Sequence, residues 1–316
     1  MKNHGGIVVG AMDYPLLQRF PGVIGFPVTP FNDEGEFDQS AFESSVRFLL
    51  DTDLTALAFC GSNGELPALT IEEHKRVSEL AVSMTDGSKG VIVGAGQTLR
   101  IAQSMARNAR AAGADAVMII APYTNDMNEP GLAEYYRAVA GESQLPCFLY
   151  QTKWSGVLSL SLLDRLANVE NICMVKDENG DISHYLKVRA NFGPRYFWVN
   201  GMAEPFVPSY WNLGVRTFTS GRACCMPQVT SRIRRLAQTG NFAPLNRILD
   251  EIEMPLYELR NRRPGYKCSM IKAGMNLCGL PGGRVRAPMI ELAETDLADL
   301  DRLLVRGKLK PDALVA

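Results

Sequence analysis

One lysine stands at the end of a short apolar run, where its amine could act as a nucleophile. The segment Asn171 to Asp181 reads NICMVKDENGD, and its apolar part, Ile172 to Val175, leads directly to Lys176. A lysine at the tip of a buried strand loses solvation, which lowers its pKa and frees the amine to attack a carbonyl. We therefore predict that Lys176 forms a Schiff base with a carbonyl substrate. The alternative is a strand-end lysine whose ammonium group simply reaches water.

A glycine-flanked polar turn follows another apolar run. The run Ala56–Cys60 is strand-like, and Gly61-Ser62-Asn63-Gly64-Glu65 comes directly after it. Two glycines permit a tight turn, while a hydroxyl, an amide and exposed backbone N–H groups together make a cradle for a carboxylate. Ser62 and Asn63 are therefore candidate substrate ligands, although the same residue types also build ordinary turns.

A tyrosine closes the apolar run that begins at Cys147. Tyr150 could point its hydroxyl into a site and relay protons, or it could pack with the hydroxyl at the rim. Lys153, three residues further on, is the rival nucleophile. It stands in a polar loop, where better solvation keeps the pKa of a lysine high, so we favour Lys176.

Cofactor and metal chemistry find little support in the sequence. The Gly94-Ala-Gly96 stretch resembles part of a dinucleotide loop, but it lacks the third glycine and the acidic residue about 20 positions on. The three histidines, His4, His74 and His184, are far apart in the chain, and the last two fall in helical stretches. We expect both to be solvated, and we expect no cofactor and no metal site.

The composition argues against several classes of partner. Lys and Arg total 33 against 34 acidic residues, a net charge of −1, so no basic surplus points to nucleic acid or an anionic membrane. No apolar run approaches the ~20 residues of a membrane span, and the N-terminus is a poor signal peptide. Seven cysteines without a C-x-x-C pair fit a reducing compartment. We expect a cytoplasmic protein that binds neither nucleic acid nor membrane.

From Gly22 onward, apolar runs of strand length alternate with longer amphipathic stretches. The runs are near-continuous, as in strands that are covered on both faces. Eight are present: Val23–Phe31, Ala56–Cys60, Gly90–Ala95, Ala116–Ala121, Cys147–Tyr150, Ile172–Lys176, Tyr196–Asn200 and Val215–Thr219. Eight β-then-α units predict an α/β fold of the closed (β/α)8 TIM barrel type rather than an open sheet.

The helical stretches between these runs carry start and stop signals. Thr70 to Glu73 forms a capping box, and an alanine-rich stretch, Leu99 to Ala112, stops at Gly113. Further helices are expected over 130–140, 160–167, 182–190, 227–239, 243–260, 267–278 and 295–305. We divide the chain into an N-terminal extension (1–21), the barrel (22–239) and a C-terminal helical region (240–316). Active sites of such barrels lie where the strands end, which makes the strand-closing residues the informative ones.

Taken together, these residues resemble the dihydrodipicolinate synthase / N-acetylneuraminate lyase family of class I, Schiff-base-forming lyases. The likeness covers about residues 22 to 305. Four features carry it: GFPVTPF (Gly25–Phe31), GSNGE (Gly61–Glu65), the strand-closing Tyr150 and VKDENGD (Val175–Asp181). The tail segment GGRVRAPMIEL, residues 282–292, also looks like the closing helical region of the family.

The resemblance implies a role for each matching residue. Lys176 would form the imine, and the Tyr150 hydroxyl would relay protons beside it. Ser62 and Asn63 would bind the carboxylate of a 2-oxo acid, with Ser62 completing the relay.

Two more positions follow from the resemblance, together with departures that limit the substrate. Gly201 stands where a backbone carbonyl often touches the substrate, and Ser220 falls in the strand-eight loop that lines the pocket. Asn63 replaces the second hydroxyl residue of the synthases, and Thr124 replaces their second tyrosine. The acidic pair of the sialic acid lyases is reduced to Ala203-Glu204. Neither dihydrodipicolinate synthesis nor sialic acid cleavage is expected.

Two activities on a small, pyruvate-like 2-oxo acid stay open. GSNGE and the RAP segment look most like 4-hydroxy-2-oxoglutarate aldolase. GFPVTPF and the KD-x-x-GD pattern look like dehydratases of 5-dehydro-4-deoxyglucarate or 2-keto-3-deoxy sugar acids. We predict a metal-free lyase that works through a lysine Schiff base, by aldol chemistry or by dehydration. A catalytically weak keto-acid sensor of the same fold is the alternative from another class. The resemblance also implies a homotetramer, a dimer of dimers.

Overall fold

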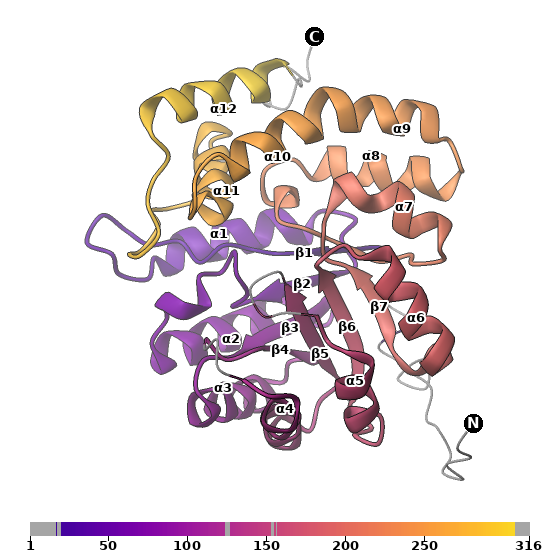
Figure 1. Ribbon diagram of the computed structural model, residues 1–316. Helices are drawn as coiled ribbons and strands as arrows, with labels where there is room; N and C mark the ends of the chain where they lie inside the picture. The colour runs from indigo at the N-terminus through magenta and orange to yellow at the C-terminus, as the bar shows by residue number, and fades with distance from the viewer. Residues whose placement is uncertain (1–16, 18–19, 124–126, 153–154, 156, 307–316) are drawn as a thin grey trace.

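Eight parallel strands close into one barrel, in which each strand pairs with its sequence neighbours and β8 returns to β1. The computed structural model describes residues 17, 20–123, 127–152, 155 and 157–306. The strands are β1 (Val23–Gly25), β2 (Ala56–Phe59), β3 (Gly90–Ala95), β4 (Ala116–Ile120), β5 (Cys147–Thr152), β6 (Ile172–Glu178), β7 (Phe197–Asn200) and β8 (Phe218–Ser220). The predicted (β/α)8 TIM barrel is confirmed (Figure 1).

Three strands end two or more residues away from their predicted ends. β1 ends at Gly25 rather than Phe31, because Pro27 and Pro30 lack the N–H group that a strand ladder needs. β5 and β6 each run two residues further than expected, to Thr152 and Glu178. The extension of β6 matters most for the site, because it places Glu178 on the same strand as Lys176.

Helices cover the outside of the barrel (Figure 1). They are α1 (Gln39–Leu50), α2 (Ile71–Thr85), α3 (Leu99–Ala112), α4 (Glu129–Ser143), α5 (Leu160–Leu166), α6 (Ile182–Phe192), α7 (Val207–Asn212) and α8 (Pro227–Gln238). The capping box at Thr70 is present, and α3 ends at Gly113 in the left-handed region, as predicted. Two of these helices, α1 and α7, were not predicted from the sequence.

The C-terminal helices gather on one side of the barrel, coloured orange to yellow in Figure 1. They are α9 (Phe242–Ile248), α10 (Met254–Asn261), α11 (Tyr266–Leu277) and α12 (Glu294–Arg306). A single helix was predicted over 243–260, but a π-helical turn, Leu249–Glu253, separates α9 from α10. Pro255 follows that turn, and its missing N–H removes one bond of the regular helical ladder. These helices supply two of the charged groups described below.

Two residues of the predicted N-terminal extension belong to the core. Leu17 and Phe20 are fully buried, and the Phe20 ring lies 5.9 Å from the ring of Phe148. The Phe20 carbonyl accepts hydrogen bonds from Thr55 and Thr217, on the segments that lead into β2 and β8. The residues just before β1 therefore pack against the barrel, and the three-part division of the chain stays a prediction.

The two described histidines are buried, so the expectation that they are solvated is wrong. His74 lies within α2 and its Nε2 is 2.8 Å from the Gly94 carbonyl oxygen. Burial lowers the pKa of His74 to about 4 and also lowers that of His184. Gly94 is needed for packing, because an added Cβ would lie 2.0 Å from the Cys60 carbonyl oxygen. Among the described residues, no group of metal-ligating side chains is present.

Candidate active site

The amine of Lys176 lies inside the barrel, beside the aromatic ring of its neighbour in the sheet. Lys176 on β6 is in register with Tyr150 on β5. Its Nζ lies 3.7 Å from the centroid of the Tyr150 ring and 5.1 Å from that of Phe26. Only 5% of the residue is exposed. The structure thus places the predicted nucleophile and the predicted relay in direct contact.

The surroundings of Lys176 shift its pKa toward neutrality. Burial lowers the pKa of Lys176 to about 8; the negative charge of Glu178 opposes the shift, and the positive charge of Lys267 adds to it. Roughly a tenth of such amines are neutral at pH 7. A nucleophilic amine is therefore present near neutral pH, while its protonated form stays paired with a carboxylate.

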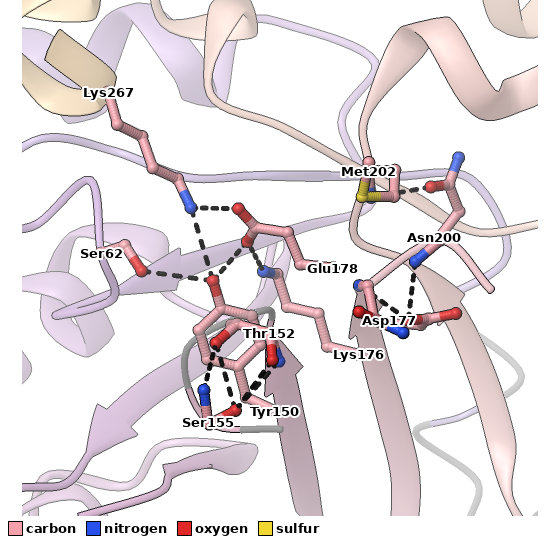
Figure 2. A network of polar contacts seen from close by, with 12 residues as sticks. Ser62, Tyr150, Thr152, Ser155, Lys176, Asp177, Glu178, Asn200, Met202 and Lys267 are labelled. Carbon is pink, nitrogen blue, oxygen red and sulfur yellow. Dashed lines mark hydrogen bonds and ion pairs between the residues drawn. The ribbon is translucent and has the colours of Figure 1, made fainter. Parts of the chain in front are cut away.

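Glu178 is a site residue that the sequence analysis did not single out. Side chains alternate along a strand, so Glu178 shares a face with Lys176, two positions before it. Its Oε2 lies 3.0 Å from Lys176 Nζ and accepts a hydrogen bond from the Tyr150 hydroxyl (Figure 2). The two-residue spacing alone could have indicated this pair, had β6 been predicted to its full length.

Two further cations reach Glu178 from the C-terminal helices. Lys267 on α11 donates to Oε1 of Glu178 and lies 3.4 Å from the Tyr150 hydroxyl, and Figure 2 shows its chain extending toward both. Arg260 on α10 places Nη2 3.5 Å from the same Oε1. Burial acts to raise the pKa of Glu178, but the three cations hold it well below its usual range. Glu178 is therefore ionised, and burial also lowers the pKa of Lys267.

Ser62 and Asn63 lie at the cavity, as the turn motif predicted. Ser62 Oγ is 3.4 Å from the Tyr150 hydroxyl oxygen, a distance at which either group can donate. Asn63 is buried, and its Oδ1 has no hydrogen-bond partner among the described residues. Burial, and then the charge of Glu178, raise the pKa of Tyr150 well above its usual value. The phenol therefore keeps its proton and can donate it.

Gly201 after β7 and Ser220 at the end of β8 differ in their access to the cavity. Gly201 lines the cavity, and only glycine fits there because an added Cβ would lie 2.8 Å from the Asp177 carbonyl oxygen. The strand-eight loop lines the inner cavity through Thr219 and Gly221, while Ser220 between them is not a lining residue, and its role in substrate binding stays a prediction. Its Oγ donates to the buried Glu204 and accepts from the backbone N–H of Ala223. A satisfied buried hydroxyl of this kind stabilises the strand-to-helix turn instead.

The two aspartates of the KD-x-x-GD pattern stabilise the end of β6 and the start of α6. Asp177 points away from the lysine and accepts hydrogen bonds from Gln151, Tyr210 and the backbone N–H of Asn179. Asp181 caps α6. These bonds fix the end of β6 against its neighbours and so hold the residues on the opposite face in place.

Two adjacent cavities with shared walls lie over the strand ends. The inner cavity, about 50 Å³, is lined by Phe26, Ser62, Asn63, Lys176, Glu178, Gly201, Ala203, Glu204, Thr219, Gly221, Arg222, Arg260, Lys267, Met270 and Ile271. An outer cavity of about 400 Å³ shares Ser62, Glu178, Gly201, Arg260 and Lys267 with it. Four cations thus line the inner cavity against two carboxylates, which favours an anionic ligand.

Two residues named from the sequence lie outside the described residues. They are Lys153, the rival nucleophile, and Thr124, which replaces the second tyrosine of the synthases.

The described helices include none long and apolar enough to cross a membrane.

The comparisons with known proteins agree with this geometry. Residues 19–306 match the profile of the dihydrodipicolinate synthetase family. This chain belongs to that family. It is 32% identical to a probable 5-dehydro-4-deoxyglucarate dehydratase of Bacillus licheniformis, over 91% of this chain and 94% of the relative. A relative of the same description from Ralstonia nicotianae is also 32% identical, over 90% and 92% of the two chains.

Solved structures of family members share the fold. Dihydrodipicolinate synthase from Bacillus clausii superposes with a TM-score of 0.87 at 28% identity, over 93% of this chain and all of the other. A prophage protein of the family from E. coli K12, in complex with pyruvate, has a TM-score of 0.83 at 26% identity, over 92% and 99%. The expected lyase of this family, nearer to the sugar-acid dehydratases, is confirmed.

Proposed function

We propose that this chain dehydrates a 2-oxo-3-deoxy sugar acid through a Schiff base on Lys176. The observation that carries the proposal is the position of this amine at the inner cavity, where it lies between the Tyr150 ring and the Glu178 carboxylate. Its pKa of about 8 leaves part of it neutral and able to attack a carbonyl. No cofactor or metal takes part in this scheme.

The reaction then follows from the chemistry of the imine. The neutral amine of Lys176 attacks C2, and loss of water gives a protonated imine that withdraws electrons. A proton leaves C3, and the C4 hydroxyl departs with its bonding electrons as a C3–C4 double bond forms. Tyr150, with its oxygen 3.4 Å from that of Ser62, supplies the proton that converts the departing hydroxyl to water. Positioned acids of this kind contribute ~10²–10⁴-fold.

The charges at the cavity support a substrate with a carboxylate at each end. Ser62 and Asn63 hold the carboxylate next to the keto group in this proposal, as the family resemblance implies. Lys267 and Arg260, which line both cavities, remain for a second carboxylate at the far end. The relatives are described as acting on 5-dehydro-4-deoxyglucarate, which is a 2-oxo acid with two carboxylates.

A substrate panel tests the proposal. Purified enzyme is incubated with 5-dehydro-4-deoxyglucarate, a 2-keto-3-deoxy sugar acid with one carboxylate, and 4-hydroxy-2-oxoglutarate. Products are scored as semialdehyde or as released pyruvate or glyoxylate. From the dicarboxylate we expect both water and CO₂ to be lost. After dehydration the C5–C6 bond breaks, its electron pair passes through the C3–C4 double bond to the imine nitrogen, and the C5 enol that remains tautomerises to the semialdehyde. We expect a kcat/KM at least about tenfold lower for the monocarboxylate. Release of pyruvate or glyoxylate as the main product would establish aldol cleavage instead.

Arg260→Met provides a matched variant for the second carboxylate. It should raise KM for the dicarboxylate by about tenfold, roughly the loss of one half-buried charge-assisted contact, and leave the KM of the monocarboxylate nearly unchanged. Equal effects on the KM of both substrates would show that Arg260 does not bind the second carboxylate.

The proposal also covers the oligomeric state of the protein and its location in the cell. We infer a homotetramer, a dimer of dimers, from the family resemblance alone, and light scattering coupled to size exclusion tests it. A cytoplasmic location is supported by the seven cysteines, all of which lie within the described residues and none of which forms a disulfide bond. The ligand is a small 2-oxo acid, with no nucleic acid or membrane as partner.

A further inference from the structure

Glu178 makes contacts that suit a reacting group rather than a structural one. Its Oε2 is 3.0 Å from the amine of Lys176 and accepts from the Tyr150 hydroxyl, while Oε1 meets Lys267 and Arg260. The carboxylate also lines both cavities. It is thus the acidic group in contact with the proposed nucleophile, at the point where the substrate must enter.

The second acid of the inner cavity has a different environment. Oε1 of Glu204 accepts hydrogen bonds from Ser220 and Thr230, and its Oε2 lies 3.9 Å from Nε of Arg222. Arg222 in turn pairs with Glu253 at 2.8 Å. Glu204 is held in this buried network and makes neither an ion pair nor a hydrogen bond with Lys176, which leaves Glu178 as the acid that can reach the imine.

Simple geometry brings Glu178 close to C3 of the bound substrate. In the Schiff base, Nζ of Lys176 becomes the imine nitrogen, C2 is bonded to it, and C3 is the next atom along. A carboxylate oxygen 3.0 Å from that nitrogen lies within hydrogen-bond reach of a proton on C3. Tyr150 places its ring, rather than its hydroxyl, over the amine, with Nζ 3.7 Å from the ring centroid.

The charge state of Glu178 suits a base. The carboxylate is ionised because Lys176, Lys267 and Arg260 surround it. An anionic substrate that pairs with Lys267 and Arg260 takes a share of these cations away from Glu178. The basicity of the carboxylate then rises at the moment when a proton must be removed.

We propose that Glu178 is the catalytic base that removes the C3 proton from the Lys176 imine. The C3–H bond breaks and its electron pair forms the C2–C3 double bond of an enamine. The C2–N double-bond electrons move onto the imine nitrogen, and the proton bonds to Oε2 of Glu178. Tyr150 remains the general acid, which protonates the C4 hydroxyl as it leaves. This inference rests on the proposed Schiff base and assigns its next step.

Hydrogen exchange separates this step from imine formation. Pyruvate is used as the probe, because its methyl carbon is C3 of the imine. The enzyme is incubated with pyruvate in D₂O, and loss of the methyl proton signal is followed by NMR. Borohydride trapping on the same samples measures the imine. For Glu178→Gln we expect trapping to persist and exchange to fall by about 10²–10⁴-fold.

Two further variants complete the design. Glu178→Asp keeps a carboxylate at a shorter reach and should recover part of the exchange lost in Glu178→Gln. Tyr150→Phe should exchange at a rate within a few-fold of the wild type. Thermal melting confirms that each variant is folded.

The outcomes distinguish the inference from the proposed function. Exchange at the wild-type rate in Glu178→Gln would overturn the base assignment, and so would a loss of exchange in Tyr150→Phe with Glu178→Gln unaffected. Equal losses of trapping and exchange in Glu178→Gln would overturn it too, because the carboxylate would then act before the imine forms. Failure of the wild type to be trapped by pyruvate and borohydride would instead refute the Schiff base itself.

Discussion

Among the described residues, two buried lysines, Lys176 and Lys272, each pair with a glutamate, and the Lys176 pair lines the cavities described above. Lys272 lies 2.5 Å from Glu65, and both side chains are fully buried. Its ammonium group also donates to the Arg284 carbonyl and lies 4.5 Å from the centroid of the Phe31 ring. Lys176, in contrast, lines the inner cavity together with its partner Glu178.

The difference lies in what surrounds each pair. Glu65 accepts from Lys272 and from the backbone N–H of Arg286, so the pair connects the GSNGE turn to α11 and the tail. Glu178 instead shares its charge among three cations and a phenol that face open space. Burial beside a carboxylate therefore does not make a lysine catalytic. A catalytic lysine must also be accessible to a ligand, and the ligand must be able to replace some of the charged partners of the pair.

Removing the cavity lysine should have the largest effect on activity. We expect Lys176→Ala to lower kcat on the order of 10⁴-fold or more, because the covalent route is lost. Its free energy of unfolding should change by only about 1 kcal/mol, since Glu178 keeps two cations. Steady-state kinetics and urea unfolding measure the two quantities. A variant that is strongly destabilised would make Lys176 resemble Lys272 and remove the contrast.

Removing the enclosed lysine should do the reverse. Lys272→Met leaves Glu65 as an uncompensated buried charge, which we expect to cost about 3–5 kcal/mol of unfolding free energy. The matched double variant Lys272→Met/Glu65→Gln should recover part of this loss. Urea unfolding follows the stability, and borohydride trapping on the folded fraction should stay normal. Loss of trapping in a folded variant would contradict the structural role.

The relay tyrosine should have an intermediate effect. Tyr150→Phe removes the hydroxyl that contacts Ser62 and Glu178, so kcat for dehydration should fall by about 10²–10³-fold. The rate of adduct formation should fall much less, because the amine and its carboxylate remain. Stopped-time trapping beside turnover measurements tests this. Equal losses in both assays would argue against a relay role.

The smallest expected effect is a shift in pH dependence. The trapping rate with pyruvate should rise with pH and level off above about 8, because only the neutral form of Lys176 attacks. Glu178 opposes the lowered pKa of this lysine, so Glu178→Gln should move the midpoint to lower pH. A midpoint near that of a free lysine would show that Lys176 is not desolvated as described.

The fold and part of the site could be predicted from local patterns. Near-continuous apolar runs and the capping signals sufficed for the barrel, and Lys176 stood out because it follows one of those runs. Tyr150 and Ser62 were recognisable because they end or follow strand-like runs, and the family resemblance then assigned a role to each. The two-residue spacing between Lys176 and Glu178 was also readable, but the strand was predicted to stop too early.

The remaining charged groups could not be found in this way. Arg260 and Lys267 lie more than eighty residues beyond Glu178, on helices whose packing over the barrel mouth depends on tertiary contacts. Ser220 was proposed as a substrate ligand from the family resemblance. Its hydroxyl instead bonds Glu204, because a strand-end side chain can turn to either side of the sheet.

Covalent trapping tests the central claim most directly. The full-length protein is incubated with pyruvate and borohydride, and the intact mass and proteolytic peptides are analysed. The account predicts one reduced pyruvyl group per chain, located on Lys176, and none on Lys267 or Lys272. Absence of an adduct on the wild type, or an adduct that survives in Lys176→Ala, would contradict it.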